Sequence, residues 1–375
     1  MTLRERVLAV YRGETPDVVP GMLDLSHWWL HRQRLPWDLS QADPTPEHDL
    51  IAAHQSYGVG YYLPTLCPFY ETQYADDVTA TVERGAEGGA PTLTWRLHTP
   101  LGSLARTRRW DDRTYSWHIG DWGVRSERDL RVLGYALGGR TFAPRADHYA
   151  AWREAVGEVG VVYLSLGYSA MGYLMSLWMG VERTIFAAHD CPDVLRGVVD
   201  EINAANLRLI DVATQLPAEI VLLGDNFSTD VQPPSFFARW SHGYYAEAVR
   251  RLHAAGKQVA LHLDGRLSGG LRMLAETGAD AADAVTPTPT GDLTPEACRA
   301  EAGPDFILSG GVAPVLWLPQ TPEADFVAAV RRWLDLRHAS ARLIAAAGDQ
   351  VPPGTDESRV RLFAEVVEEH GRYEA

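Results

Sequence analysis

The sequence predicts an α/β fold: a single (β/α)8 barrel with an N-terminal helix and a β-hairpin insertion. Short apolar runs alternate with helical patterns from about residue 144 onward, two further apolar runs precede that region, and no glycine-rich phosphate loop follows the first run. Alternating strands and helices are typical of a parallel sheet, whereas an open doubly wound sheet usually carries such a loop. Eight strand-like runs therefore favour one closed barrel domain over residues 1–375.

Local periodicity in the sequence predicts the first helix, the first two strands and the insertion. Apolar side chains in residues 1–12 recur at helical spacing, and Gly13 ends the pattern. The apolar runs 18–23 and 61–66 then predict the first two strands. Between residues 78 and 110 the pattern alternates around a glycine-rich break, which predicts an antiparallel hairpin inserted into the barrel.

Six further strands are expected in the second part of the chain. Each is a short apolar run bounded by helical or turn-forming sequence. The runs are VVYLSL (161–166), AEIVLLGD (218–225), QVALHL (258–263), ADAADAV (279–285), DFILSGG (305–311) and RLIAAAGD (342–349).

The composition excludes some classes of binding partner. A formal net charge of −15 and the lack of massed Lys and Arg argue against a nucleic-acid surface. No window is apolar enough for a membrane span, and the N-terminus resembles neither a secretory signal nor a transit peptide. Three scattered cysteines suggest neither a disulfide framework nor a thiolate zinc site. We expect a cytoplasmic protein with a small-molecule substrate; the oligomeric state is left open, with a homodimer as one option.

Polar side chains that end apolar runs are the candidates for function, because a barrel gathers its chemistry at the C-terminal ends of its strands. His262 and Asp264 are two positions apart at the end of one run, so they share a strand face and could chelate a metal ion. Each such residue, taken singly, is also typical of an ordinary strand-end turn. The others are Asp24, His27, Asp225, Asn226 and Asp349.

The chain also resembles a known family. The stretches that carry the resemblance are TLRERVLAVYRGETPDVVP, TPLGSLARTRRW, GDNFSTDVQPPSFFARW, GKQVALHLDG, LSGGV and GDQVPPGTDESRVRLFAEVVEEHG. Together they are similar to the uroporphyrinogen decarboxylase superfamily, nearly from end to end. The resemblance implies a TIM barrel and one of two chemistries: cofactor-free decarboxylation of a porphyrinogen, or corrinoid-linked methyl transfer by zinc-dependent enzymes.

The methyltransferase branch is similar at a His-x-Cys pair and at a second cysteine near the last strand. Here those positions read His262, Asp264 and Asp349, so both thiolates are replaced by carboxylates. The resemblance therefore implies a metal site with harder ligands, acceptable to Zn²⁺ and nearly as acceptable to Mn²⁺ or Fe²⁺.

The decarboxylase branch is similar in having an arginine-rich loop after the first strand. Arg32 and Arg34 are present here, but the compact arginine motif of that branch is not, and the neighbouring tryptophans favour a less anionic ligand. Solvated surface charge is the commoner role of arginines. True porphyrinogen decarboxylation is therefore disfavoured.

Our leading hypothesis is a metal-dependent methyltransferase that demethylates a small donor, such as a methoxylated aromatic compound, and passes the methyl group to a corrinoid. No Asp-x-His-x-x-Gly motif is present, so the corrinoid is expected on a partner protein. The alternatives are a lyase that decarboxylates a small acid or tetrapyrrole, and a non-catalytic barrel that binds a corrinoid. The hypothesis assigns the metal to His262, Asp264 and Asp349, catalysis to Asp225, Asn226 and His27, and substrate binding to Trp28, Trp29 and Arg32.

Overall fold

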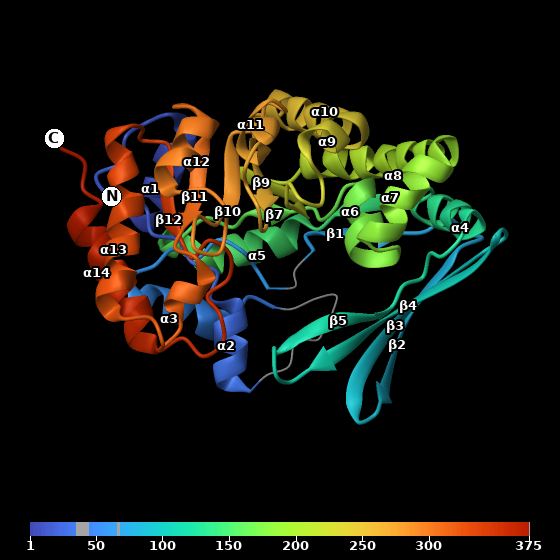
Figure 1. Cartoon of the computed structure of the whole chain (residues 1–375), viewed down its shortest axis with the longest axis horizontal. Coiled ribbons are helices and arrows are strands. Elements are labelled where there is room, and N and C mark those ends of the chain that lie inside the picture. Colours follow the sequence, from blue (N-terminus) through green and yellow to red (C-terminus); the bar gives the residue numbers. More distant parts are fainter. Residues whose placement is uncertain (35–44, 66–67, 375) are drawn as a thin grey trace.

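The computed structural model describes residues 1–34, 45–65 and 68–374, and they form an α/β fold around a six-stranded parallel sheet (Figure 1). The strand order is β12-β11-β10-β9-β8-β7, so each strand pairs with its neighbour in the sequence of strands. The predictions for the second part of the chain are confirmed, because each of the six apolar runs coincides with one strand, one of which extends past its run to Phe227. The strands are β7 (Leu164–Ser165), β8 (Ile220–Phe227), β9 (Gln258–Leu263), β10 (Ala281–Val285), β11 (Ile307–Gly311) and β12 (Leu343–Ala346).

The first two predicted strands lie between β12 and β7, where they form single bridges instead of extended strands. Gly21 bridges Ala345 of β12, and the parallel bridge from Met22 to Gly60 joins the two segments to each other. A third bridge, Tyr61 to Gly160, links the second segment to the chain just before β7. The described part of the run 61–66 ends at residue 65.

The helices pack outside the sheet (Figure 1). Parallel strands are buried on both faces, which explains why every side chain of β10, β11 and β12 is buried. In the described part of the chain, no helix is long and apolar enough to cross a membrane. The α-helices are α1 (Leu3–Arg12), α2 (Ser26–Gln33), α3 (His48–Tyr57), α4 (Glu127–Gly138), α5 (Ala146–Val156), α6 (Ala170–Gly172), α7 (Val181–Asp190), α8 (Pro192–Ala213), α9 (Pro234–Trp240), α10 (His242–Ala254), α11 (Gly270–Ala275), α12 (Pro295–Ala302), α13 (Glu323–Leu334) and α14 (Glu357–His370).

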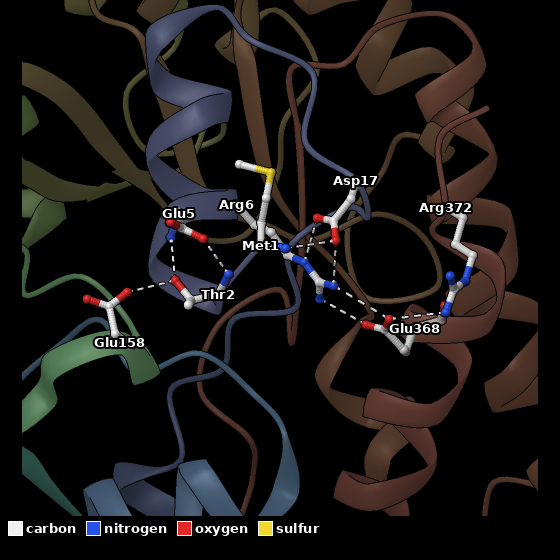
Figure 2. Close-up of polar contacts among 8 residues, drawn as sticks. All are labelled: Met1, Thr2, Glu5, Arg6, Asp17, Glu158, Glu368 and Arg372. Carbon is white, nitrogen blue, oxygen red and sulfur yellow. Dashed lines mark hydrogen bonds and ion pairs between the residues drawn. The ribbon is translucent and has the colours of Figure 1, made fainter. Parts of the chain in front are cut away.

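The N-terminal helix is fixed at its start and to the end of the chain (Figure 2). Thr2 and Glu5 form a reciprocal capping box that satisfies backbone N–H groups in the first turn of α1. Arg6 donates to Asp17 at 2.9 Å and to Glu368 of α14 at 2.8 Å. These ion pairs hold α1 beside the last helix.

The insertion is larger than the predicted hairpin. It is a four-stranded antiparallel sheet of β2 (Thr79–Glu87), β3 (Ala90–Thr99), β4 (Gly102–Asp111) and β5 (Ser116–Asp121). The fourth strand, SWHIGD, lies beyond the predicted hairpin, which ended at residue 110, although its Trp117 and Ile119 alternate with polar residues. A separate antiparallel pair, β1 (Tyr70–Gln73) with β6 (Thr141–Pro144), flanks the insertion along the chain.

Candidate active site

The histidine at the end of β9 is held by an aspartate on the neighbouring strand. His262 and Asp283 are register partners in the parallel β9–β10 pair, and His262 Nδ1 lies 2.9 Å from Asp283 Oδ2. Because a carboxylate only accepts, Nδ1 carries the hydrogen, and among the described residues Nε2 has no hydrogen-bond partner. The His262 side chain remains 19% exposed while that of Asp283 is 3% exposed, so the imidazole is the accessible member of the pair.

Further carboxylates surround this pair. Burial alone would lower the pKa of His262, but the hydrogen bond and charge of Asp283, with the charges of Asp349 and Asp264, raise it to about 9. Burial raises the pKa of Asp349 to about 6, and the charges of Asp264, Asp24 and Asp283 add to that effect. The negative charges of these carboxylates therefore favour the protonated, cationic form of the imidazole.

Asp24 follows the first strand segment, and its charge acts on Asp349. It bridges Gln350 in the parallel sense, and its carboxylate accepts hydrogen bonds from the Ser26 backbone N–H at 2.9 Å and from Gln350 Nε2 at 3.1 Å. Its side chain is nearly fully buried, and burial raises its pKa. These contacts join the segment after the first strand to the segment after β12.

The predicted metal ligands are close enough for their charges to interact, yet they do not converge on one point. In residues 1–34, 45–65 and 68–374, no group of three or more His, Cys, Asp or Glu side chains is arranged to hold a metal ion. The kinds of donor atom, one imidazole nitrogen and several carboxylate oxygens, do suit a divalent cation. The metal site assigned to His262, Asp264 and Asp349 stays a prediction.

Asp225 and Asn226 lie near the end of β8 and make different contacts. Asp225 is 3% exposed and accepts hydrogen bonds from Ser169, one of them from the backbone N–H at 2.6 Å. Burial raises the pKa of Asp225 to about 6. Asn226 is exposed, and its Nδ2 lies 3.5 Å from Asp264 Oδ2. Asp225 thus orients the start of α6, and Asn226 is the member of the pair that reaches the carboxylates.

His27 and the two tryptophans lie on α2. His27 Nε2 is 3.0 Å from the backbone oxygen of Tyr115, which connects α2 to the insertion. Trp28 is fully buried, and its Nε1 donates to a backbone carbonyl, while Trp29 packs partly buried against the same core. Trp28 is therefore a core residue and not the pocket wall that the sequence suggested, because a large apolar ring is more stable inside the protein.

Arg32 contacts the last helix, and its assignment to substrate binding stays a prediction. Its guanidinium makes an ion pair at 3.1 Å with Glu357 at the start of α14 and lies over the Trp28 ring. Both side chains of the ion pair are partly exposed. In the structure, this contact fastens α2 to the last helix.

Asp283 was missed by the sequence reasoning, although a signal for it was present. It is a charged residue in the middle of the apolar run ADAADAV, and its side chain is buried. A buried carboxylate requires a partner. The partner, His262, lies on another strand, so the sequence alone does not identify it.

Comparisons with known proteins place the chain in a family. The family model "Uroporphyrinogen decarboxylase (URO-D)" matches residues 164–370, more than half of the chain. A methyltransferase from Methanosarcina mazei is 17% identical, with 98% of this chain and 99% of that chain covered at a TM-score of 0.63, so the two share a fold. D-psicose 3-epimerase from Clostridium cellulolyticum H10 is 12% identical over 65% of this chain and 83% of its own, at a TM-score of 0.36. No curated protein matches the sequence. The family match confirms the resemblance seen in the sequence, and the chain belongs to the uroporphyrinogen decarboxylase (URO-D) family.

Proposed function

We propose that this protein is a methyltransferase of the URO-D family that takes a methyl group from a small methoxylated aromatic donor and passes it to a corrinoid on a partner protein. The observation that carries the proposal is the accessible imidazole of His262, fixed by Asp283 and surrounded by Asp24, Asp264 and Asp349. The family membership is consistent with it. In the reaction, the methyl–oxygen bond breaks, the methyl group forms a bond to the reduced corrinoid cobalt, and the oxygen leaves as a phenolate that takes a proton.

The proposal retains a divalent metal, with zinc as the first candidate, held by His262, Asp264 and Asp349. When bound, such a cation supplies Lewis-acid stabilisation of the negative charge on the departing oxygen. Its binding would displace the proton from His262 Nε2 and would require the side chains to turn toward a common point.

The residues of the chain itself orient this site. Asp283 accepts the Nδ1 hydrogen of His262, which fixes the orientation of the ring. In the proposal, Nε2 is the atom that faces the substrate or the metal. The amide of Asn226 lies next to Asp264, and we assign to it a hydrogen bond to an oxygen of the substrate. Asp24 is held by Ser26 and Gln350, which limits its movement.

A methyl-transfer assay tests the proposal. The purified protein is mixed under anaerobic conditions with 2-methoxyphenol or a related donor and with cob(I)alamin, and the loss of the cob(I)alamin absorbance is followed together with the demethylated phenol. Equal amounts of both changes, dependent on the protein, are expected. Release of carbon dioxide from a small aromatic acid without corrinoid, and no demethylation across the donor panel, would favour the lyase instead.

We also propose that the sheet closes as a (β/α)8 barrel in one domain. This is supported by hydrogen bonds from Met22 N to Ala345 O at 2.8 Å, from Gly60 N to Gly21 O at 2.7 Å and from Val161 N to Tyr61 O at 3.0 Å. If the barrel is closed, these amides exchange with solvent as slowly as those of the central strands. Fast exchange at Met22 and Gly60 would indicate an open sheet.

A further inference from the structure

The insertion has a cavity of about 560 Å³ on one face of its sheet. Arg84 of β2 and Leu93 of β3 are register partners, and both line the cavity. Trp110 of β4 and Trp117 of β5 are a second pair of register partners that line it. Leu93 also pairs with Arg108, two positions before Trp110, so both pairs lie on the same face. The volume is within the range of about 300–1,000 Å³ that is typical of small-molecule sites.

Three aromatic side chains form one wall of the cavity. The ring centre of Trp110 lies 4.9 Å from that of Tyr115 and 5.5 Å from that of Trp117, both in edge-to-face contact. Trp110 Nε1 donates to Asp112 at 2.6 Å, and the Tyr115 hydroxyl donates to the backbone oxygen of Leu30 at 3.1 Å. Because the protein already satisfies these polar atoms, Trp110 and Tyr115 offer a ligand apolar ring surface.

The end of α2 contributes an arginine to the same cavity. Arg34 follows the last residue of α2 and lines the cavity. Tyr115 holds α2 there, since its backbone oxygen lies 3.0 Å from His27 Nε2 and its ring centre lies 5.0 Å from that of His31. In the described part of the chain, the Arg34 guanidinium has no hydrogen bond or ion pair. A cationic group is therefore available beside the aromatic wall.

Backbone strain is found at the same place. Arg34 has a φ of 57° and Tyr115 a φ of 53°, in the left-handed region that is unfavourable for residues other than glycine. Among the described residues, the other non-glycine positions with positive φ are Asn226 of β8 and Ala284 of β10, the two strands beside β9. Strained positions in the described chain thus occur at this cavity and beside the strand of His262. Such strain is concentrated at functional sites.

The charges that line the cavity are mainly positive. Arg34 and Arg84 contribute two guanidinium groups, and Asp112 contributes the one carboxylate among the described lining residues. The carboxylate of Asp112 is already engaged by the Trp110 indole. The positive charge and the aromatic wall together favour an anionic ligand that carries a ring.

We propose that this cavity binds a small aromatic carboxylate, whose ring packs against Trp110 and Trp117 and whose oxyanion pairs with Arg34. The planar guanidinium group matches the geometry of a carboxylate, and Arg84 adds positive charge to the lining. The site is separate from the carboxylates around His262, none of which lines the cavity, so it is independent of whether the protein transfers methyl groups.

Isothermal titration calorimetry of the purified full chain tests this inference. The probes are benzoate, its neutral analogue benzamide, and acetate as a carboxylate without a ring. The variants are Arg34→Gln, which removes the cation, and Trp117→Leu, which removes part of the aromatic wall. The matched control is Arg96→Gln, since Arg96 is three positions from Leu93 on β3 and lies on the opposite face, where it pairs with Glu83 at 2.9 Å. Thermal unfolding of each variant shows whether it is folded.

Benzoate is expected to bind the wild-type protein, to bind Arg34→Gln at least about tenfold more weakly, and to bind Arg96→Gln within about twofold of wild type, because only the first loses a charged hydrogen bond. Trp117→Leu should weaken benzoate binding at least about threefold. Arg34 is exposed, so Arg34→Gln is expected to fold. Equal binding of benzamide and benzoate, an unchanged affinity in Arg34→Gln, acetate binding as tight as that of benzoate, or no binding of benzoate would overturn the proposal.

Discussion

Gly224 of β8 faces His262 of β9 so closely that a Cβ atom on Gly224 would lie 2.5 Å from the Cβ of His262. The two residues are register partners in the parallel pair, and the missing side chain leaves the space that the histidine occupies. The position of the imidazole thus depends on a glycine from a different strand.

Replacing this glycine should displace the histidine. We expect Gly224→Ala to lower the free energy of unfolding by about 1–3 kcal/mol, as overpacking does, and to reduce methyl transfer at least about tenfold. Chemical denaturation and the cob(I)alamin assay measure the two effects. The control is Gly197→Ala on an exposed position of α8, where a Cβ meets nothing within 4 Å and helix propensity predicts a gain of about 0.5–1 kcal/mol. A Gly224→Ala enzyme with normal activity would contradict the close-packing argument.

The His262–Asp283 pair should be needed for activity more than for folding. His262→Ala is expected to abolish methyl transfer in a protein that still folds but melts at a lower temperature, because the buried Asp283 loses its partner. Asp283→Asn is expected to reduce the rate about 10–100-fold, because the amide orients the ring less strongly. The matched control is His253→Ala, which removes a similar pair, His253 Nε2 to Asp280 at 2.8 Å, from a more exposed position. If all three variants lose activity equally, the effect is one of stability and not of the site.

The metal prediction can be checked without an activity assay. Mass-spectrometric metal analysis of the purified protein is expected to show about one equivalent of a divalent ion per chain, zinc first, and His262→Ala is expected to lose most of it. His253→Ala should keep it. A metal-free protein that transfers methyl groups at the full rate would remove the metal from the proposal.

The contacts of Asp17 predict that the free energy of unfolding falls as the pH is lowered into the acid range. The hydrogen bond from Arg6 is the main reason why the pKa of Asp17 is lowered to about 2. For a carboxyl group with a lowered folded-state pKa, the stabilisation is complete above its usual pKa and is lost as the pH falls through the folded value. Asp17→Asn should therefore be less stable than wild type above about pH 4, with the difference vanishing near about pH 2. Urea unfolding across this range measures it, with the exposed Asp200→Asn as control; a difference that does not change with pH would contradict the assignment.

Local patterns were enough to locate the parallel strands. Runs such as QVALHL and DFILSGG are apolar because both faces of their strands are buried, so their composition alone indicates the structure. Their position at strand ends likewise identified His262 and Asp349 as candidates, and in the structure the charge of His262 affects the pKa of Asp349. The run 18–23 was found too, but its pairing is limited to bridges, and Pro20 in it cannot donate a backbone hydrogen bond.

The tertiary structure decided which of these residues meet. Asp283 faces His262 because two strands separated by a helix pair in one register, and register depends on long-range packing that no local pattern encodes. The same holds for Trp28, whose ring is buried between elements distant in sequence, and for Arg106, which is stacked between Trp95 and Trp178. The sequence by itself determined the family, the strands and the strand-end candidates; the packing of helices and strands against each other determined which side chains form a site, because burial and contact are properties of the folded chain.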